Sequence, residues 1–202
     1  MANEDRLVWI DCEMTGLSMT RDVLIEVACI VTDGDLNELD AGRTVVIKPP
    51  AAALQQMDDF VTNMHTESGL IAELNGGVTV DEAEKTILDY IKSHVREPRK
   101  APLCGSSVYV DRGFLNRDMP DIDAFLHYRV IDVSSFKEVV RRWYPKVYYA
   151  SPDKHGNHRA LADILESIAE LRYYRDAVLV PPPGPDTTAA RLIAQRHGSD
   201  DS

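Results

Sequence analysis

Apolar residues form three strand-like runs in the first quarter of the chain. The first run covers 7–10 and continues into Asp11-Cys12-Glu13, the second covers 22–33, and the third covers 44–48 before Pro49-Pro50 stops it. Short runs rich in Val and Ile that end at turn-forming residues are typical of buried β-strands. We therefore predict that the three runs form an antiparallel meander.

Helical spacing of apolar residues characterises four later segments. The first of these helices is expected behind Thr79, which forms a capping-box pattern with Glu82. Two short apolar runs, 101–105 and 128–132, are predicted to be further strands. Ser106 or Ser107 is expected to cap the second helix, and Ser134 or Ser135 to start the third. The predicted buried faces are Ala83, Ile87, Leu88, Ile91 and Val95 on the first helix, Val108, Phe114 and Leu115 on the second, Phe136, Val139, Val140 and Trp143 on the third, and Leu161, Ile164, Leu165, Ile168 and Leu171 on the last.

Three segments lack a regular apolar period. We expect 49–78 to be irregular or weakly helical and 145–157 to be a loop with a flexible end. The C-terminal segment is rich in Pro, which cannot occupy a helix interior. The sequence therefore predicts one domain over 1–176 and a Pro-rich, partly disordered tail over 177–202, with one helical turn around 189–195.

The first strand ends in a pair of carboxylates. Asp11 and Glu13 point to the same face because side chains alternate along a strand. Two buried carboxylates repel each other and lose hydration, so they favour a divalent cation such as Mg²⁺ or Mn²⁺. The alternative is a strand end that simply enters solvent, and for Asp-x-Glu alone this alternative is the favoured one. The rest of the chain must decide between them.

Other polar residues differ in how strongly their surroundings indicate function. Asp111 lies in the middle of an apolar helix face, and a carboxylate there is destabilising by several kcal/mol unless it is paired or bound to metal. Arg112 and Arg117 lie on other faces and are not obvious partners for it. We interpret Asp111 as functional, Glu26 as solvent-facing or on a sheet edge, and His65 as structural or on the surface.

His158 and Asp163 lie near the end of the regular part of the chain. They are five residues apart and so do not share a helix face. On a helical wheel Asp163 falls away from the apolar stripe, which alone would make it an exposed carboxylate. The two can still converge if His158 lies in the loop just before the last helix.

Composition is typical of an ordinary globular protein. The chain has 202 residues, of which 44% are hydrophobic and 27% charged, which fits one domain with a substantial core. No apolar run approaches the roughly 20 residues of a membrane span, and the polar N-terminus shows no secretory-signal pattern. Cys12, Cys29 and Cys104 each lie in an apolar run, which indicates buried thiols in a reducing compartment. We therefore expect a cytoplasmic location.

The net charge is −11, from 22 Lys and Arg against 33 Asp and Glu. Non-specific binding along duplex nucleic acid relies on a basic surface, so this charge argues against tracking a long polyanion. It permits a small anionic ligand that is held by metal ions and a few cationic side chains.

The order of the acidic residues and the histidine resembles that of the DEDDh exonucleases, which are 3′→5′ exonucleases on the ribonuclease H-like fold. The set consists of Asp11-x-Glu13 on the first strand, Asp111 on a mid-chain helix, and His158-x4-Asp163 near the end. Nearly the whole chain, to about residue 176, resembles the oligoribonuclease family more closely. The segments that carry this likeness are WIDCEMTGL (9–17), PLCGSS…DRGFLNRDMP (102–120), HYRVIDVSSFKEVVRRW (127–143) and HRALADILESIAELRYYR (158–175).

This resemblance implies an α/β, ribonuclease H-like fold with a mixed five-stranded sheet flanked by helices, and it implies a homodimer. It implies two divalent metal ions, Mg²⁺ or Mn²⁺, and cleavage of short 5′-phosphorylated oligoribonucleotides, down to dinucleotides, into 5′-mononucleotides. It assigns the metal ions to Asp11, Glu13, Asp111 and Asp163, and the role of general base to His158. The substrate contacts that it implies are Leu17 as a wedge between terminal bases, Phe60 as an aromatic beside it, Tyr128 from the partner subunit, Arg129 with Ser134 as a cap on the 5′ phosphate, and His65 and Ser107.

The sequence departs from the family pattern at a few places. Phe60 stands where many relatives carry Trp, Val110 precedes Asp111 where relatives often have a polar residue, and the Pro-rich tail extends beyond the usual end. None of these departures affects the five metal-binding and base positions.

Three alternatives remain open from sequence. One is another DEDDh enzyme that proofreads DNA or trims tRNA, which product analysis on a dinucleotide against a long single strand distinguishes. The others are a protein that only binds nucleic acid or a signalling nucleotide, and a scaffold stabilised by calcium or magnesium. His158 beside a complete carboxylate set argues against binding alone, which needs no base. Metal-dependent release of mononucleotides excludes both.

Overall fold

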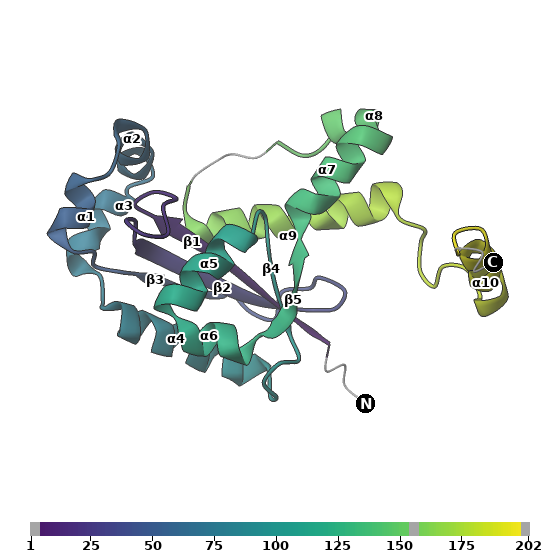
Figure 1. Ribbon diagram of the computed structural model, residues 1–202, viewed down its shortest axis with the longest axis horizontal. Helices are drawn as coiled ribbons and strands as arrows, with labels where there is room; N and C mark the ends of the chain where they lie inside the picture. The colour runs from purple at the N-terminus through teal and green to yellow at the C-terminus, as the bar shows by residue number, and fades with distance from the viewer. Residues whose placement is uncertain (1–4, 154–157, 199–202) are drawn as a thin grey trace.

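One mixed β-sheet runs through the computed structural model, which describes residues 5–153 and 158–198 (Figure 1). Its strands are β1 (Arg6–Met14), β2 (Leu24–Asp33), β3 (Arg43–Val46), β4 (Pro102–Gly105) and β5 (His127–Asp132). They lie in the order β3-β2-β1-β4-β5. The β1–β2 and β2–β3 pairs are antiparallel, while β1–β4 and β4–β5 are parallel. The predicted meander and the mixed five-stranded sheet are both confirmed.

Helices flank both faces of this sheet (Figure 1). The region 49–78 is more helical than predicted and contains three short α-helices and a 3₁₀ helix. The predicted loop over 145–157 is wrong at its start, because Pro145 begins a short helix at a position that suits its fixed φ. The helices are α1 (Ala51–Gln55), α2 (Asp59–Glu67), α3 (Leu70–Glu73), η1 (Leu74–Gly76), α4 (Val80–His94), α5 (Tyr109–Asp118), α6 (Pro120–Phe125), α7 (Val133–Trp143), α8 (Pro145–Tyr149), α9 (Ala160–Val178) and α10 (Thr187–Gln195).

Because side chains alternate along β1, the strand contributes residues to two separate hydrophobic cores. Ile10 and Cys12 pack into a core that includes residues of α4, α5 and α6. Trp9 packs on the opposite face, into a core with residues of α7 and α9. Because Asp11 and Glu13 share the face of Trp9, they point toward the layer that contains α9.

Two of the predicted apolar helix faces are only partly buried. On α7, Val140 is buried, but Phe136 and Val139 are exposed and Trp143 exposes 71% of its surface. On α9, Leu165 is exposed although it lies among buried neighbours. These predictions were wrong because periodicity identifies an apolar face but does not say what covers it. In the described part of this one chain, β5 is an edge strand, and the outer face of α7 beside it remains in solvent.

Helix starts follow the predicted capping chemistry only in part. Thr79 and Glu82 form the reciprocal capping box at α4, as predicted. The predicted serine cap of α5 is wrong, because Ser107 has a φ of 55° and its N–H donates to Asp132. Asp132 also caps α7 by accepting from the N–H of Ser134, so the carboxylate rather than a serine starts that helix.

Several predictions about the ends of the chain have limited or different outcomes. The N-terminal segment 1–4, the flexible loop end at 155–157 and the last residues 199–202 lie outside the described residues. In the tail, α10 is longer than the single turn that was predicted, and Asp186 caps it. All three cysteines are buried free thiols, as predicted. Among the described residues, no helix has the length and hydrophobicity needed to cross a bilayer.

Candidate active site

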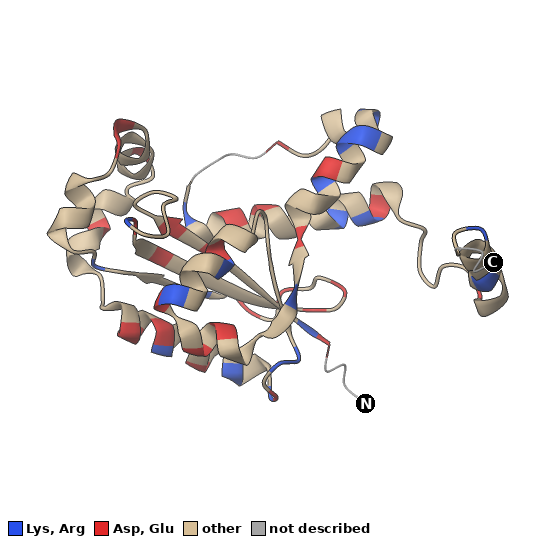
Figure 2. Ribbon diagram, viewed as in Figure 1, with Lys and Arg blue, Asp and Glu red and all other residues tan. Residues whose placement is uncertain are grey.

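Acidic residues gather at one edge of the sheet. The parallel strands β1, β4 and β5 end at this edge, and β2, which runs antiparallel to β1, starts there. In open α/β sheets, ligands bind outside the carboxyl ends of the strands. The edge carries Asp11 and Glu13 on β1, Glu26 on β2 and Asp132 at the end of β5, while Asp163 comes from the first turn of α9. Figure 2 marks acidic positions on β1, on β2 and on α9.

Three carboxylates converge at this edge. One ligand oxygen from each of Asp11, Glu13 and Asp163 lies within 4.8 Å of the others. Glu13 is buried, and the other two are half-buried. The wheel-based interpretation of Asp163 as a plain exposed carboxylate is therefore wrong, because the first turn of α9 lies against the end of β1.

Burial and mutual repulsion destabilise the ionised carboxylates of the cluster, so a bound cation would stabilise them. Burial, and then the negative charges of Asp111, Glu13 and Asp163, raise the pKa of Asp11 well above its usual range. Burial, followed by repulsion from Asp163 and Glu26, raises the pKa of Glu13 to about 8, with Arg159 partly opposing the shift. A hard oxygen-donor set of this kind fits Mg²⁺ or Mn²⁺, whose charge would offset the repulsion. The alternative of a strand end entering solvent does not describe these buried groups.

Asp111 lies behind the cluster and has a partner that the sequence did not reveal. Its Oδ1 accepts a hydrogen bond of 3.0 Å from the N–H of Cys12. Burial raises the pKa of Asp111 to about 7, although backbone hydrogen bonds oppose the shift. As predicted, neither neighbouring arginine pairs with it, since Arg112 pairs with Asp123 and Arg117 pairs with Asp118. Asp111 is not part of the group within 4.8 Å. Its carboxylate instead binds the backbone of β1 at Cys12, between Asp11 and Glu13.

The two histidines occupy different environments beside the carboxylates. His158 is exposed and lies two residues before α9, just ahead of the helix as predicted, with a φ of 46°. His65 on α2 is fully buried, and its Nε2–H donates to the carbonyl of Met14 at 2.9 Å. In the neutral ring Nδ1 then carries the lone pair, and this atom lies 4.0 Å from Glu13 Oε2. Burial lowers the pKa of His65, and the nearby charge of His158 adds to this.

Glu26 corrects a second sequence interpretation. It was expected on a sheet edge or facing solvent, yet its exposed fraction is 0%. It lies directly opposite Glu13 in the β1–β2 register. Arg159 pairs with its Oε1 at 2.8 Å, and the N–H of Ala160 donates to its Oε2 at 2.9 Å. The negative charge of Glu26 is thus compensated by the chain itself, unlike that of Glu13.

Two apolar side chains stand exposed at this end of the molecule. Leu17 exposes 72% of its surface and Phe60, at the start of α2, exposes 75%. The loop of Leu17 is held by Asp22, which is buried and accepts from the N–H of Ser18 at 2.8 Å. A side chain at Gly16 would collide with the same carboxylate. Both exposed residues are therefore presented by ordered backbone, in a form that suits contact with a flat ligand.

The remaining predicted contacts lie at both ends of β5, with Tyr128 and Arg129 near its start and Ser107 and Ser134 beside its carboxyl end. Tyr128 exposes 72% of its surface, stacks on His127 with ring centroids 4.5 Å apart, and accepts from the Nε of the exposed Arg129 at 3.1 Å. Asp132 Oδ1 accepts from the N–H of Ser107, and from both the N–H and the hydroxyl of Ser134. One carboxylate thus joins the β4–α5 loop to the start of α7 and brings Ser107 and Ser134 together.

Comparisons with known proteins identify relatives of this chain. The RNase T exonuclease family model matches residues 8–171. The oligoribonuclease of Streptomyces coelicolor is 63% identical over 193 residues, which cover 96% of each chain. Those of Cutibacterium acnes and Mycobacterium leprae are 55% and 54% identical, covering at least 95% of this chain and at least 92% of theirs.

The chain belongs to the oligoribonuclease family of exonucleases. It is accordingly a nuclease of the hydrolase class.

The fold of this oligoribonuclease-family chain is also found in larger exonucleases. Exonuclease I of E. coli, in a zinc-bound complex with single-stranded DNA, matches with a TM-score of 0.67 and 14% sequence identity. The match covers 86% of this chain but only 41% of that one. A metal-free form of the same complex matches with a TM-score of 0.64 at 15% identity, over 86% of this chain and 40% of that one. At this level of identity the likeness establishes the fold alone.

Sequence reasoning missed Asp132 and Arg159 and misplaced Glu26, three residues that organise the site of this oligoribonuclease-family member. Asp132 had a usable signal, because an acidic residue directly before a helical segment is a common N-cap. Glu26 and Arg159 had none, because they lie 133 residues apart and neither belongs to a local motif. Their contact follows from the tertiary structure, in which the start of α9 lies against β2.

Proposed function

We propose that the protein is a 3′→5′ exoribonuclease that degrades short oligoribonucleotides, down to dinucleotides, to 5′-mononucleotides. The convergence of Asp11, Glu13 and Asp163 within 4.8 Å is the observation that carries this proposal, and His158 lies two residues before α9, the helix that carries Asp163. Membership of the oligoribonuclease family supports the substrate class, since the relatives bear that name.

Two divalent ions, Mg²⁺ or Mn²⁺, would be held by Asp11, Glu13 and Asp163, with Asp111 completing the carboxylate set. Bound there, such ions supply Lewis-acid polarisation of the phosphate and stabilise the charge that develops on the attacking and leaving oxygens. The raised pKa values of Asp11 and Glu13 support this role, because buried like charges favour cation binding. Cations would also compensate the negative field that an anionic substrate meets in a chain of net charge −11.

His158 acts in this proposal as the general base that takes a proton from the attacking water. Histidine is the side chain that most often acts as a general acid or base in enzymes. The exposed position of His158 just before α9 leaves the ring free to reach a bound phosphodiester. The buried His65, fixed by its bond to Met14, instead serves as a rigid wall next to Glu13.

Substrate orientation follows from the exposed residues around the cluster. Leu17 and Phe60 offer apolar surfaces on which terminal bases can pack. Arg129 and Ser134 would bind the 5′ phosphate, and His65 and Ser107 would complete the pocket. Binding a terminal phosphate closes the site to longer chains, which explains a preference for short substrates. The 2′-hydroxyl would distinguish RNA from DNA.

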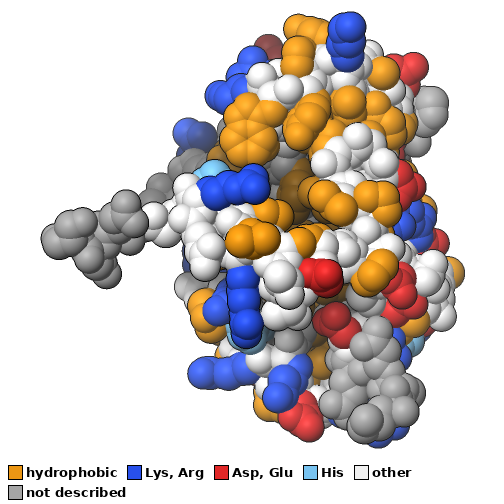
Figure 3. All heavy atoms as spheres, turned by 90° about the vertical axis from the view of Figure 1, so that its right-hand side faces the viewer, with side chains coloured by type: hydrophobic (Ala, Val, Ile, Leu, Met, Phe, Trp, Pro, Cys, Tyr) orange, Lys and Arg blue, Asp and Glu red, His pale blue; other side chains and the backbone are white. Residues whose placement is uncertain are grey.

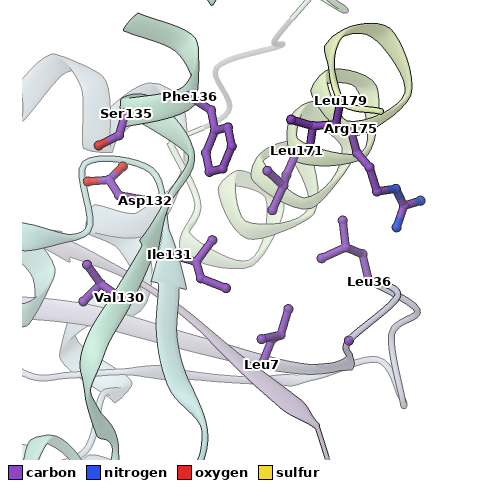
Figure 4. A pocket seen from close by; sticks show the side chains of 11 residues that line it. Leu7, Leu36, Val130, Ile131, Asp132, Ser135, Phe136, Leu171, Arg175 and Leu179 are labelled. Carbon is purple, nitrogen blue, oxygen red and sulfur yellow. The ribbon is translucent and has the colours of Figure 1, made fainter. Parts of the chain in front are cut away.

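A homodimer completes this proposal, with Tyr128 reaching the active site of the partner subunit. The exposed face near α7 and β5 supports it, since Val130, Phe136, Val139 and Trp143 are all solvent-exposed. Figure 3 shows hydrophobic side chains around a hollow on one face of the molecule. A cavity of about 550 Å³ opens between β5, α7 and α9, and Figure 4 shows Phe136 and Leu171 on either side of it, above Ile131 and Leu7. Apolar surface of this kind is a feature of protein interfaces.

A cytoplasmic location is part of the proposal. Three buried thiols are compatible with a reducing compartment, and short RNA fragments are produced inside cells.

The test is hydrolysis of 5′-phosphorylated RNAs from two to about seven nucleotides long, in Mn²⁺ and in EDTA. We expect 5′-mononucleotides as products, with the highest kcat/KM for the dinucleotide and no turnover in EDTA. Preference for a long single strand would instead support an exonuclease of another substrate class. An intact dinucleotide in Mn²⁺ would refute the proposal.

A further inference from the structure

An ion-pair cluster of three residues fixes the start of α9. Arg159, the residue before the helix, pairs with Glu26 at 2.8 Å and with Glu73 at 2.9 Å. Its Nε also donates to Glu26 Oε1 at 3.1 Å, and its Nη2 donates to Glu73 Oε2 at 3.0 Å. The other oxygen of Glu26 accepts from the N–H of Ala160, the first residue of α9. Strand β2, helix α3 and helix α9 are therefore joined at one guanidinium.

The burial of Glu26 makes this connection specific. A fully buried carboxylate is strongly destabilising unless charge and hydrogen bonds compensate it, and Arg159 with the N–H of Ala160 provides both. A bidentate Arg–carboxylate pair also fixes geometry more tightly than a point charge does. The backbone at 159 and 160 is thus held to Glu26 on β2, the residue directly opposite Glu13.

His158 immediately precedes Arg159 in the chain. It has a φ of 46°, a conformation that residues other than Gly adopt infrequently and that persists where the surroundings impose it. The described contacts that fix the backbone beside it are those of Arg159 and Ala160. We infer that Glu26 and Arg159 are positioning residues, which hold the backbone of His158 so that its imidazole can reach the attacking water. This inference rests on the proposed role of His158 as the base.

Loss of this cluster should leave the helix itself in place. Buried side chains along α9, including Ile164, Ile168 and Leu171, pack into the core that contains Trp9. Ala160, the first residue of the helix, belongs to the same core, and none of these core contacts is made by the side chain of Arg159. Substitutions in the cluster should therefore change the geometry of His158 without removing α9 from the sheet.

The first experiment measures kcat and KM of Glu26→Gln and Arg159→Gln on a 5′-phosphorylated RNA dinucleotide at saturating Mn²⁺. Misplacing a reacting group by about 1 Å can lower rates by about 100-fold, so we expect kcat to fall about 10- to 100-fold with KM changed less than about threefold. Arg159→Lys keeps the charge but loses the bidentate geometry, and it should recover part of kcat. Arg172→Gln is the matched control, because it removes an ion pair with Glu38 from the same helix and should keep the kcat of the parent protein.

The second experiment combines Arg159→Gln with His158→Ala. If Arg159 acts through His158, the double variant is no slower than His158→Ala beyond about twofold. Equal loss in both backgrounds would overturn the positioning role and leave His158 as the base. A slow Arg159→Gln with KM raised and kcat retained, or an equal loss in Arg172→Gln, would also overturn it. A fully active His158→Ala would refute the base itself, and the positioning role with it.

Discussion

Glu13 and Glu26 lie directly opposite each other on β1 and β2, and only one of them is neutralised by the chain. Arg159 and the N–H of Ala160 occupy both oxygens of Glu26. Glu13 faces Asp11 and Asp163 instead, and burial with this repulsion raises its pKa to about 8. Two identical side chains on neighbouring strands thus have different roles, one structural and one suited to binding a cation.

Replacing Glu13 should separate stability from activity. In Glu13→Gln the repulsion in the acidic cluster is relieved, so the metal-free protein should gain about 1–3 kcal/mol of unfolding free energy at pH 8. The same variant should lose most Mn²⁺ affinity and turnover. Urea unfolding in EDTA and calorimetric Mn²⁺ titration measure the two effects. The exposed Asp89→Asn on α4 is the control and should change stability by less than about 0.5 kcal/mol. A destabilised Glu13→Gln would show that the cluster is not repulsive.

The stability of the metal-free protein should depend on pH in a defined direction. The folded pKa of Glu13 is about 8 and that of Asp111 about 7, both above their ordinary values of 4.5 and 3.8. Between those limits the native state binds more protons than the unfolded state, so unfolding free energy falls as pH rises from about 4 to 8 and levels off above. Mn²⁺ displaces the same protons, and its affinity should rise across this window. Urea unfolding in EDTA at stepped pH, and Mn²⁺ calorimetry in buffers of different ionisation enthalpy, measure both trends. Stability that rises with pH in EDTA would contradict the assignment.

Arg129 should distinguish substrates by their 5′ end. Loss of charged hydrogen bonds to a phosphate weakens binding by about 10- to 100-fold. Arg129→Ala should therefore raise KM by that factor for 5′-phosphorylated RNA dinucleotides. The KM for dinucleotides that lack the 5′ phosphate should change by less than about twofold. Arg141→Ala on α7, which removes an exposed arginine paired with Glu138, is the control. Equal losses on both substrates would remove Arg129 from the phosphate site.

The exposed face of α7 should control the oligomeric state. Trp143 exposes 71% of its surface, and a charge placed at the centre of an apolar interface opposes association. Trp143→Glu should therefore convert a dimer into monomers in sedimentation velocity, with lower activity because the partner's Tyr128 is lost. Leu54→Glu, on the distant helix α1, should leave the sedimentation unchanged. A wild-type chain that sediments as a monomer at micromolar concentration would contradict the homodimer.

Much of the fold follows from local patterns. The strands, the capping box at Thr79 and the cores around α4 and α9 were all predictable, because period-2 and period-3.6 spacing report directly on burial. Short helices such as α8 were missed because five residues carry too little periodicity. The exposure of Phe136 and Trp143 was not predictable, because a wheel gives the apolar side of a helix without its neighbour.

Some residues of the candidate site were likewise predictable from the sequence, and others were not. Asp11 and Glu13 could be placed together from strand alternation, and the burial of Asp111 from its apolar face. The approach of Asp163 could not be derived from the wheel, because it depends on where α9 begins relative to β1. Glu26 was placed in solvent because its partner Arg159 lies 133 residues away. A local sequence pattern can indicate that a buried charged residue requires a partner, but it does not identify a partner that is distant in the sequence.

Arg117 has a further consequence for the loop that presents Leu17. From the end of α5, its guanidinium donates to the carbonyls of Met19 and Asp22, within that loop. The same helix carries Asp111, whose carboxylate is bonded to the backbone of β1. The apolar tip of the loop and the strand that carries the acidic cluster are consequently both anchored to α5. In the proposed function, a fixed spacing between Leu17 and the acidic cluster would place one terminal nucleotide at the cleavage position in each reaction cycle.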